Sequence, residues 1–98
     1  MKVVTICGSM RYAADMQRIA RELTCNNGWC VLQCVYDTSL PVDASEKSKL
    51  KDAHLKRIDI SDAIYVVNIG GYIGSSTKDE ISYALAHNKE VIYHEKIN

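Results

Sequence analysis

The sequence is poor in the features that mark several classes of protein. It has one proline, five glycines and no phenylalanine among 98 residues, which excludes a collagen-like or low-complexity chain. No apolar run approaches the ~20 residues of a membrane-spanning helix, and the apolar stretch from Met1 to Cys7 is too short for the core of a signal peptide. Twelve basic residues balance twelve acidic ones, so no charge excess favours a polyanion. We therefore expect a cytoplasmic protein that binds neither a nucleic acid polymer nor a membrane.

The length and the apolar content describe one small globular unit. Hydrophobic residues make up 47% of the chain and charged residues 24%, as in ordinary folded proteins. Residues 1–98 are too few for two self-sufficient cores, so we expect a single domain. A domain of this size buries a modest core. We therefore expect a homodimer or a larger homo-oligomer.

The four cysteines are expected to be free thiols, because the cytosol keeps thiols reduced. They are Cys7, Cys25, Cys30 and Cys34. Their spacing includes no C-x2-C pair and no nearby histidine, which is unlike a structural zinc site. We interpret Cys7 as a small apolar residue of a strand. The sequence predicts no metal and no cofactor.

The pattern of apolar residues predicts strands that alternate with helices. We expect strands at 2–7, 29–35, 63–69 and 91–94, and helices at 13–24, 45–58 and 76–87. Residues 37–52 are polar and contain the single proline, so we expect a loop there that leads into the second helix. The alternation predicts an α/β fold: a small doubly wound, flavodoxin- or Rossmann-like three-layer sandwich with a mainly parallel four-stranded sheet in the order 2-1-3-4.

Two unusual loops follow the first and third predicted strands. In the first, residues 8–11, backbone N–H groups, Ser9 and Arg11 are suited to hold a phosphate or sugar hydroxyls. The alternative is a plain turn in which Ser9 caps a helix. The second loop, residues 68–76, combines three glycines with hydroxyl side chains but matches neither the Walker A nor the dinucleotide-binding pattern. The predicted strand order places both loops at one crevice.

Glu80 has two interpretations. The run Thr77-Lys78-Asp79-Glu80 has the pattern of a capping box, in which Glu80 would bond back to the first N–H of the helix. A carboxylate in the first turn of a helix at the mouth of a crevice is also placed to attack an electrophilic sugar carbon. The local pattern by itself favours the capping box, although one residue can fill both roles.

Three segments together resemble a known superfamily. They are CGSMR from Cys7, ISDAIYVVN in the third predicted strand, and GGYIGSSTKDEISYALAHNKEVIYHE after it. The sequence resembles the nucleoside 2-deoxyribosyltransferase-like superfamily, which includes nucleoside 5′-monophosphate N-glycosidases. The resemblance covers most of the chain and is weakest over 38–50. It implies that Glu80 is the nucleophile of a reaction at an N-glycosidic bond, through a covalent glycosyl-enzyme.

The resemblance also implies a phosphorylated substrate. In nucleotide-cleaving members the first loop and the serines of the second grip the 5′-phosphate, which corresponds here to Ser9, Arg11 and Ser75 or Ser76. Tyr72 is suited to stack on the base. The predicted substrate-binding residues are Gly8, Ser9, Arg11, Asn68, Gly71, Tyr72, Gly74, Ser75 and Ser76.

The general acid has several candidates, because the chain departs from the superfamily at Asn68. Transferases of the superfamily often have an Asp there, and an amide cannot give up a proton as an acid does. Asp59, Asp62 and His54 are candidates, and we pair Asp59 with Glu80 as the catalytic residues. Asp62 has the alternative role of a turn or cap, and His54 and Asp59 that of a solvated helix face.

Three functions from different classes remain open. The first is an enzyme that cleaves or transfers the N-glycosidic bond of a (deoxy)nucleoside or its 5′-monophosphate. The second is a non-catalytic nucleotide-binding module, which Asn68 favours. The third is a flavodoxin-like electron carrier, which the first loop disfavours because it lacks the hydroxyl-rich phosphate cradle of a flavin site.

Overall fold

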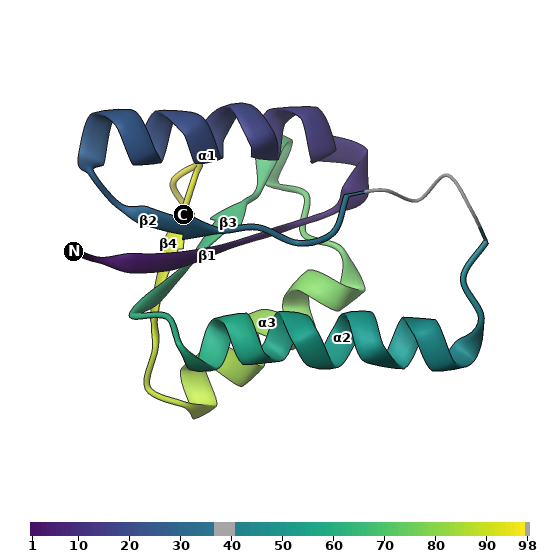
Figure 1. Cartoon of the computed structure of the whole chain (residues 1–98). Helices are drawn as coiled ribbons and strands as arrows, with labels where there is room; N and C mark the ends of the chain where they lie inside the picture. Colours follow the sequence, from purple (N-terminus) through teal and green to yellow (C-terminus); the bar gives the residue numbers. More distant parts are fainter. Residues whose placement is uncertain (37–40, 98) are drawn as a thin grey trace.

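A parallel sheet lies at the centre of the molecule (Figure 1). The structure, a computed structural model, describes residues 1–36 and 41–97. Its four strands are β1 (Val3–Gly8), β2 (Cys30–Leu32), β3 (Ala63–Val67) and β4 (Glu90–Tyr93), in the order β2-β1-β3-β4. All three neighbouring pairs are parallel. The predicted fold class and strand order are confirmed.

Helices cover both faces of this sheet. Helix α1 (Ala13–Asn27) lies on one face, and α2 (Ala44–Asp59) and α3 (Ser75–Ala86) lie on the other (Figure 1). Short 3₁₀ turns, η1 (Met10–Tyr12) and η2 (Ile69–Gly71), follow β1 and β3. Within the described residues, no helix combines the length and the apolar character needed to cross a membrane.

The core consists of two apolar clusters, one on each face of the sheet. On one face, Ile6 and Val67 pack with the apolar stripe of α1, namely Met16, Ile19, Ala20 and Leu23. On the other, Cys7 and Ile64 pack with Ile58 of α2 and Ala84 of α3. Ile6 and Cys7 belong to different clusters because successive strand residues point to opposite faces. Cys7 therefore faces the layer that contains α2 and α3.

Three elements differ from their predicted ranges by more than one residue at an end: α1 is longer than predicted, and β2 and β3 are shorter. Strand β2 is shorter than predicted, because it pairs with β1 only through Cys30–Leu32 at the edge of the sheet. Helix α2 (Ala44–Asp59) agrees with its predicted range of 45–58 to within one residue at each end, and Asp43 forms a capping box with Glu46 at its start. Residues 37–40 of the predicted loop lie outside the described part of the chain.

The predicted capping box at Thr77–Glu80 is wrong. Gly74 is the N-cap of α3 and Ser75 is its first residue. Thr77 is buried in the first turn, with 3% of its surface exposed. Glu80 therefore lies in the second turn of α3, too far along the helix to bond to the N-cap.

We predict that Ile58 holds α2 on the sheet. Its side chain is fully buried, whereas Ile60 two residues later is 58% exposed. Ile58→Ala is expected to lower the free energy of unfolding by about 2–5 kcal/mol, because it leaves a cavity in the core. Ile60→Ala is the matched control, with an expected loss of about 0.5 kcal/mol or less. Urea denaturation followed by circular dichroism measures both, and equal losses would contradict the prediction.

Candidate functional site

A cavity of about 530 Å³ opens beside the carboxyl end of β1. This volume lies within the ~300–1,000 Å³ range of small-molecule sites. Its wall comes from β1, η1 and α1, from the segment after β2, and from α2 and α3. Polar and titratable residues of the wall are Cys34, Lys47, Lys51, His54, Arg57, Ser76, Asp79, Glu80 and Tyr83.

Glu80 and His54 face each other at the wall of this cavity. Glu80 extends from α3 and its side chain is 21% exposed, while His54 extends from α2 and its side chain is 11% exposed. The Glu80 Oε1 to His54 Nε2 distance is 3.5 Å. His54 Nδ1 is buried and has no hydrogen-bond partner among the residues that the structure describes. The packing of two helices thus aims a carboxylate and an imidazole at one point.

Cys7 of β1 completes a cluster with these two side chains. Its Sγ lies 3.6 Å from His54 Nε2, and the ligand atoms of Cys7, His54 and Glu80 all lie within 4.8 Å of one another. Burial raises the pKa of the Cys7 thiol, and the negative charge of Glu80 raises it further. The thiol is therefore neutral at neutral pH. Sequence analysis missed this cluster, because Cys7 and His54 are 47 positions apart and share no motif.

The two loops lie side by side, as the strand order requires. The Arg11 guanidinium lies over the Tyr72 ring, 4.0 Å from Cζ to the ring centroid. The Tyr12 hydroxyl donates a hydrogen bond of 3.2 Å to the carbonyl oxygen of Ile69. The Ser9 hydroxyl accepts a hydrogen bond of 3.3 Å from the Arg11 N–H, so Ser9 has the capping role that was its alternative. Ser9 and Arg11 do not line the cavity, although their chain neighbours Gly8 and Met10 do.

Among the small residues of the two loops, Gly8 and Ser76 reach the cavity. Gly8 also has a packing role, since a Cβ there would lie 3.0 Å from Met16 Sδ and 3.3 Å from Val67 Cβ. Gly71, with a φ of +80°, adopts a conformation that favours glycine. Gly74 is the N-cap of α3 and Ser75 is its exposed first residue.

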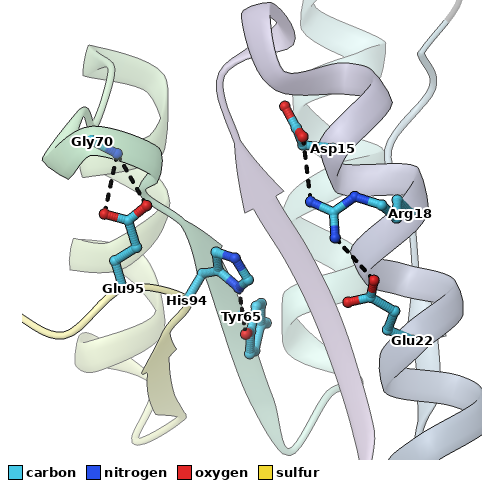
Figure 2. Close-up of polar contacts among 7 residues, drawn as sticks. All are labelled: Asp15, Arg18, Glu22, Tyr65, Gly70, His94 and Glu95. Carbon is cyan, nitrogen blue, oxygen red and sulfur yellow. Dashed lines mark hydrogen bonds and ion pairs between the residues drawn. The ribbon is translucent and has the colours of Figure 1, made fainter.

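The structure does not bring Asn68 to the cavity. Asn68 is 2% exposed, its Nδ2 donates to the Glu95 carbonyl oxygen (2.9 Å), and its Oδ1 accepts from the Glu95 N–H (2.7 Å). The Glu95 carboxylate accepts in turn from the Gly70 N–H, 3.2 Å to each oxygen (Figure 2). Next to Glu95, His94 Nδ1 is 2.8 Å from the Tyr65 hydroxyl (Figure 2). Asn68 thus fastens the segment after β4 to the glycine loop.

The two carboxylates proposed as acids also lie away from the cavity wall. Asp59 accepts a hydrogen bond of 2.6 Å from the Tyr83 hydroxyl, which raises the pKa of Tyr83. Only Tyr83 of this pair lines the cavity. Asp62 accepts a hydrogen bond of 2.8 Å from the Val3 N–H. Val3 is the first residue of β1, so Asp62 lies at the amino ends of the strands, opposite the carboxyl ends where the cavity opens. Asp79, which sequence analysis left aside, is a carboxylate that does line the cavity.

We predict that Asn68 contributes to stability through its two bonds to Glu95. Asn68→Ala is expected to lower the free energy of unfolding by about 1–3 kcal/mol, because it removes both hydrogen bonds between the buried Asn68 side chain and the Glu95 backbone, each of which contributes about 0.5–1.5 kcal/mol. Asn26→Ala on the exposed surface of α1 is the matched control, with an expected change of about 0.5 kcal/mol. Urea denaturation measures both, and an Asn68→Ala variant as stable as the control would disprove the role.

The chain is similar in fold to a solved structure, that of the CMP N-glycosidase BcmB of Clostridium botulinum. The similarity covers 94% of this chain and 70% of that chain, with a TM-score of 0.60 and 20% sequence identity. No protein-family model and no curated protein sequence matches the chain. At this level of identity the similarity establishes the shared α/β fold.

Proposed function

We propose that the protein cleaves the N-glycosidic bond of a nucleoside 5′-monophosphate, with Glu80 as the nucleophile. The observation that carries the proposal is the position of Glu80, a largely buried carboxylate at the wall of a cavity of about 530 Å³. The sequence resemblance assigned the same residue to this role. The fold that the chain shares with a CMP N-glycosidase supports the same class of reaction.

The chemistry would take place in two steps. In the first, a carboxylate oxygen of Glu80 bonds to the anomeric carbon, and the electron pair of the broken C–N bond leaves with the base. In the second, water attacks the anomeric carbon, releases the sugar phosphate and restores the carboxylate. A second nucleobase in place of water would make the reaction a transfer. His54, 3.5 Å away, would orient the Glu80 carboxylate.

The departing base takes up a proton, which a second carboxyl group commonly supplies in glycoside cleavage. Asp59, predicted for this role, reaches the cavity only through its bond with the Tyr83 hydroxyl. Asp79 lines the cavity next to Glu80 in the sequence. We therefore place Asp79 ahead of Asp59 as the residue that contacts the leaving base.

The charge of the cavity supports an anionic substrate. Lys47, Lys51 and Arg57 line it from α2, and Ser76 lines it from α3. Arg11 follows the cavity-lining Met10 in the chain and is stacked on Tyr72. Cations and a hydroxyl of this kind bind phosphate oxygens through charge-assisted hydrogen bonds. These residues favour a 5′-monophosphate over the uncharged nucleoside.

Glu80→Gln is predicted to abolish cleavage, because the amide is a poor nucleophile. Release of free base from a panel of nucleosides and 5′-monophosphates, followed by chromatography, is expected to fall on the order of a thousandfold or more. Glu22→Gln on the exposed face of α1 is the matched control and is expected to keep full activity. Full turnover by Glu80→Gln would disprove the nucleophile. Binding of monophosphates without base release by the native protein would favour the non-catalytic binding module.

Arg11→Ala is predicted to lower activity on 5′-monophosphates but not on nucleosides. Loss of a charged contact to phosphate is expected to lower kcat/KM for a 5′-monophosphate about tenfold, through about 1.5 kcal/mol, and to leave that for the nucleoside unchanged. Arg21→Ala, on the exposed surface of α1, is the control for the loss of one positive charge. An equal loss for both substrates would place Arg11 outside the phosphate site.

A further inference from the structure

The cluster of Cys7, His54 and Glu80 presents three different metal-binding groups to one point. A thiol comes from β1, an imidazole from α2 and a carboxylate from α3. The Sγ to Nε2 distance is 3.6 Å and the Nε2 to Oε1 distance is 3.5 Å. Each ligand belongs to a different element of the fold, so the packing of the two helices on the sheet holds the three groups together.

These distances agree with the edges of a tetrahedral zinc site. Zinc binds sulfur at about 2.3 Å and nitrogen or oxygen at about 2.0–2.1 Å. At tetrahedral angles these lengths separate sulfur from nitrogen by about 3.6 Å, and nitrogen from oxygen by about 3.4 Å. The two measured separations are close to both values. The third separation, from Cys7 Sγ to the Glu80 carboxylate oxygen, lies within 4.8 Å, so rotation of side chains would bring all three ligands to one ion.

We propose that Cys7, His54 and Glu80 bind a divalent zinc ion. The Cys7 thiol gives its proton to water and binds as the thiolate, His54 binds through Nε2, and Glu80 binds through a carboxylate oxygen. The two negative ligands balance the two positive charges of the ion. A neutral assembly of this kind removes the cost of a lone buried carboxylate.

The position of the cluster leaves one coordination site open. Cys7 is 1% exposed and lies behind the cavity wall, whereas His54 and Glu80 form part of that wall. The ion would enter through the cavity and keep a water molecule as its fourth ligand on the cavity side. Three protein ligands and one open position distinguish such a site from a closed structural one.

Zinc at this cluster would inhibit the enzyme, a consequence that rests on the function proposed above. Zinc bound to one oxygen of Glu80 withdraws negative charge from the whole carboxylate, so the second oxygen becomes a poor nucleophile toward the anomeric carbon. Zinc and the glycosyl group therefore compete for the same carboxylate. The protein would be active without the ion and inactive with it, so free zinc would act as a reversible inhibitor.

Binding of Co²⁺ and Zn²⁺ to the full chain tests the site directly. Co²⁺ titration is expected to give the visible bands of a tetrahedral ion and the near-ultraviolet charge-transfer band of a thiolate, at one ion per chain, and Zn²⁺ is expected to displace it. Cys7→Ser is expected to remove the thiolate band. Loss of a direct ligand is also expected to weaken Zn²⁺ binding more than the ~10- to 100-fold typical of a lost outer-shell partner.

Cys34→Ser is the matched control, because Cys34 lines the same cavity but is not a member of the cluster. It is expected to bind both ions as the native protein does. If Cys7→Ser does not fold, His54→Gln replaces it, and the same loss of Zn²⁺ affinity is expected. A cooperative thermal unfolding transition shows that the variant is folded. No stoichiometric binding by the native protein would overturn the proposal, as would native affinity in Cys7→Ser or His54→Gln.

The test distinguishes failure of this site from failure of the proposed function, since metal binding is measured without any nucleotide. If base release is established, Zn²⁺ is expected to inhibit it at the same concentrations at which Zn²⁺ displaces Co²⁺ from the protein. Zinc bound at the cluster with undiminished base release would overturn the inhibitory role. Zinc binding by a protein that releases no base would support the site and contradict the proposed reaction.

Discussion

The site depends on the parallel pairing of β1 with β3. Five residue pairs, from Val4 with Ala63 to Gly8 with Val67, fix the register of these two strands. Because they are parallel, both end at the same edge of the sheet, and the loops and helices that follow them begin there. This register brings Arg11 against Tyr72. It also sets where α3 crosses the face on which Cys7 lies, and so where Glu80 meets His54.

The cavity concentrates polarity in a small apolar layer. Cys7 belongs to the core cluster of α2 and α3, yet its Sγ contacts an imidazole beside a carboxylate. Buried polar groups of this kind are costly for a small core. Departures from the ordinary rules of packing tend to occur at functional sites. Both proposals depend on the same property of Glu80: a largely buried carboxylate oxygen can donate an electron pair. In one proposal the acceptor is an anomeric carbon, and in the other it is a metal ion.

Asn68 shows how a local interpretation and a tertiary one can differ. Transferases of the superfamily often have an Asp at this position, so Asn68 suggests that the general acid is missing and that the protein binds nucleotides without cleaving them. In the structure its side-chain amide donates one hydrogen bond to the Glu95 carbonyl oxygen and accepts one from the Glu95 N–H. A carboxylate there would have no hydrogen to donate to the Glu95 carbonyl. The amide is explained by the fold, so it gives no separate support to loss of activity.

The helices, the strands and their order could be predicted from the sequence, because apolar periodicity and glycine breaks act over neighbouring residues. The resemblance to a superfamily, rather than any local pattern, pointed to Glu80 as a candidate nucleophile. The sequence placed most helix and strand ends within a few residues. The capping-box pattern misidentified Thr77 as the N-cap of α3, whereas Gly74 is the N-cap and Thr77 is buried in the first turn. Only the tertiary structure decided that Cys7 and His54 join Glu80 while Asp59 and Asn68 point elsewhere. Such contacts depend on sheet register and on the rotation of each helix, which no local spacing records.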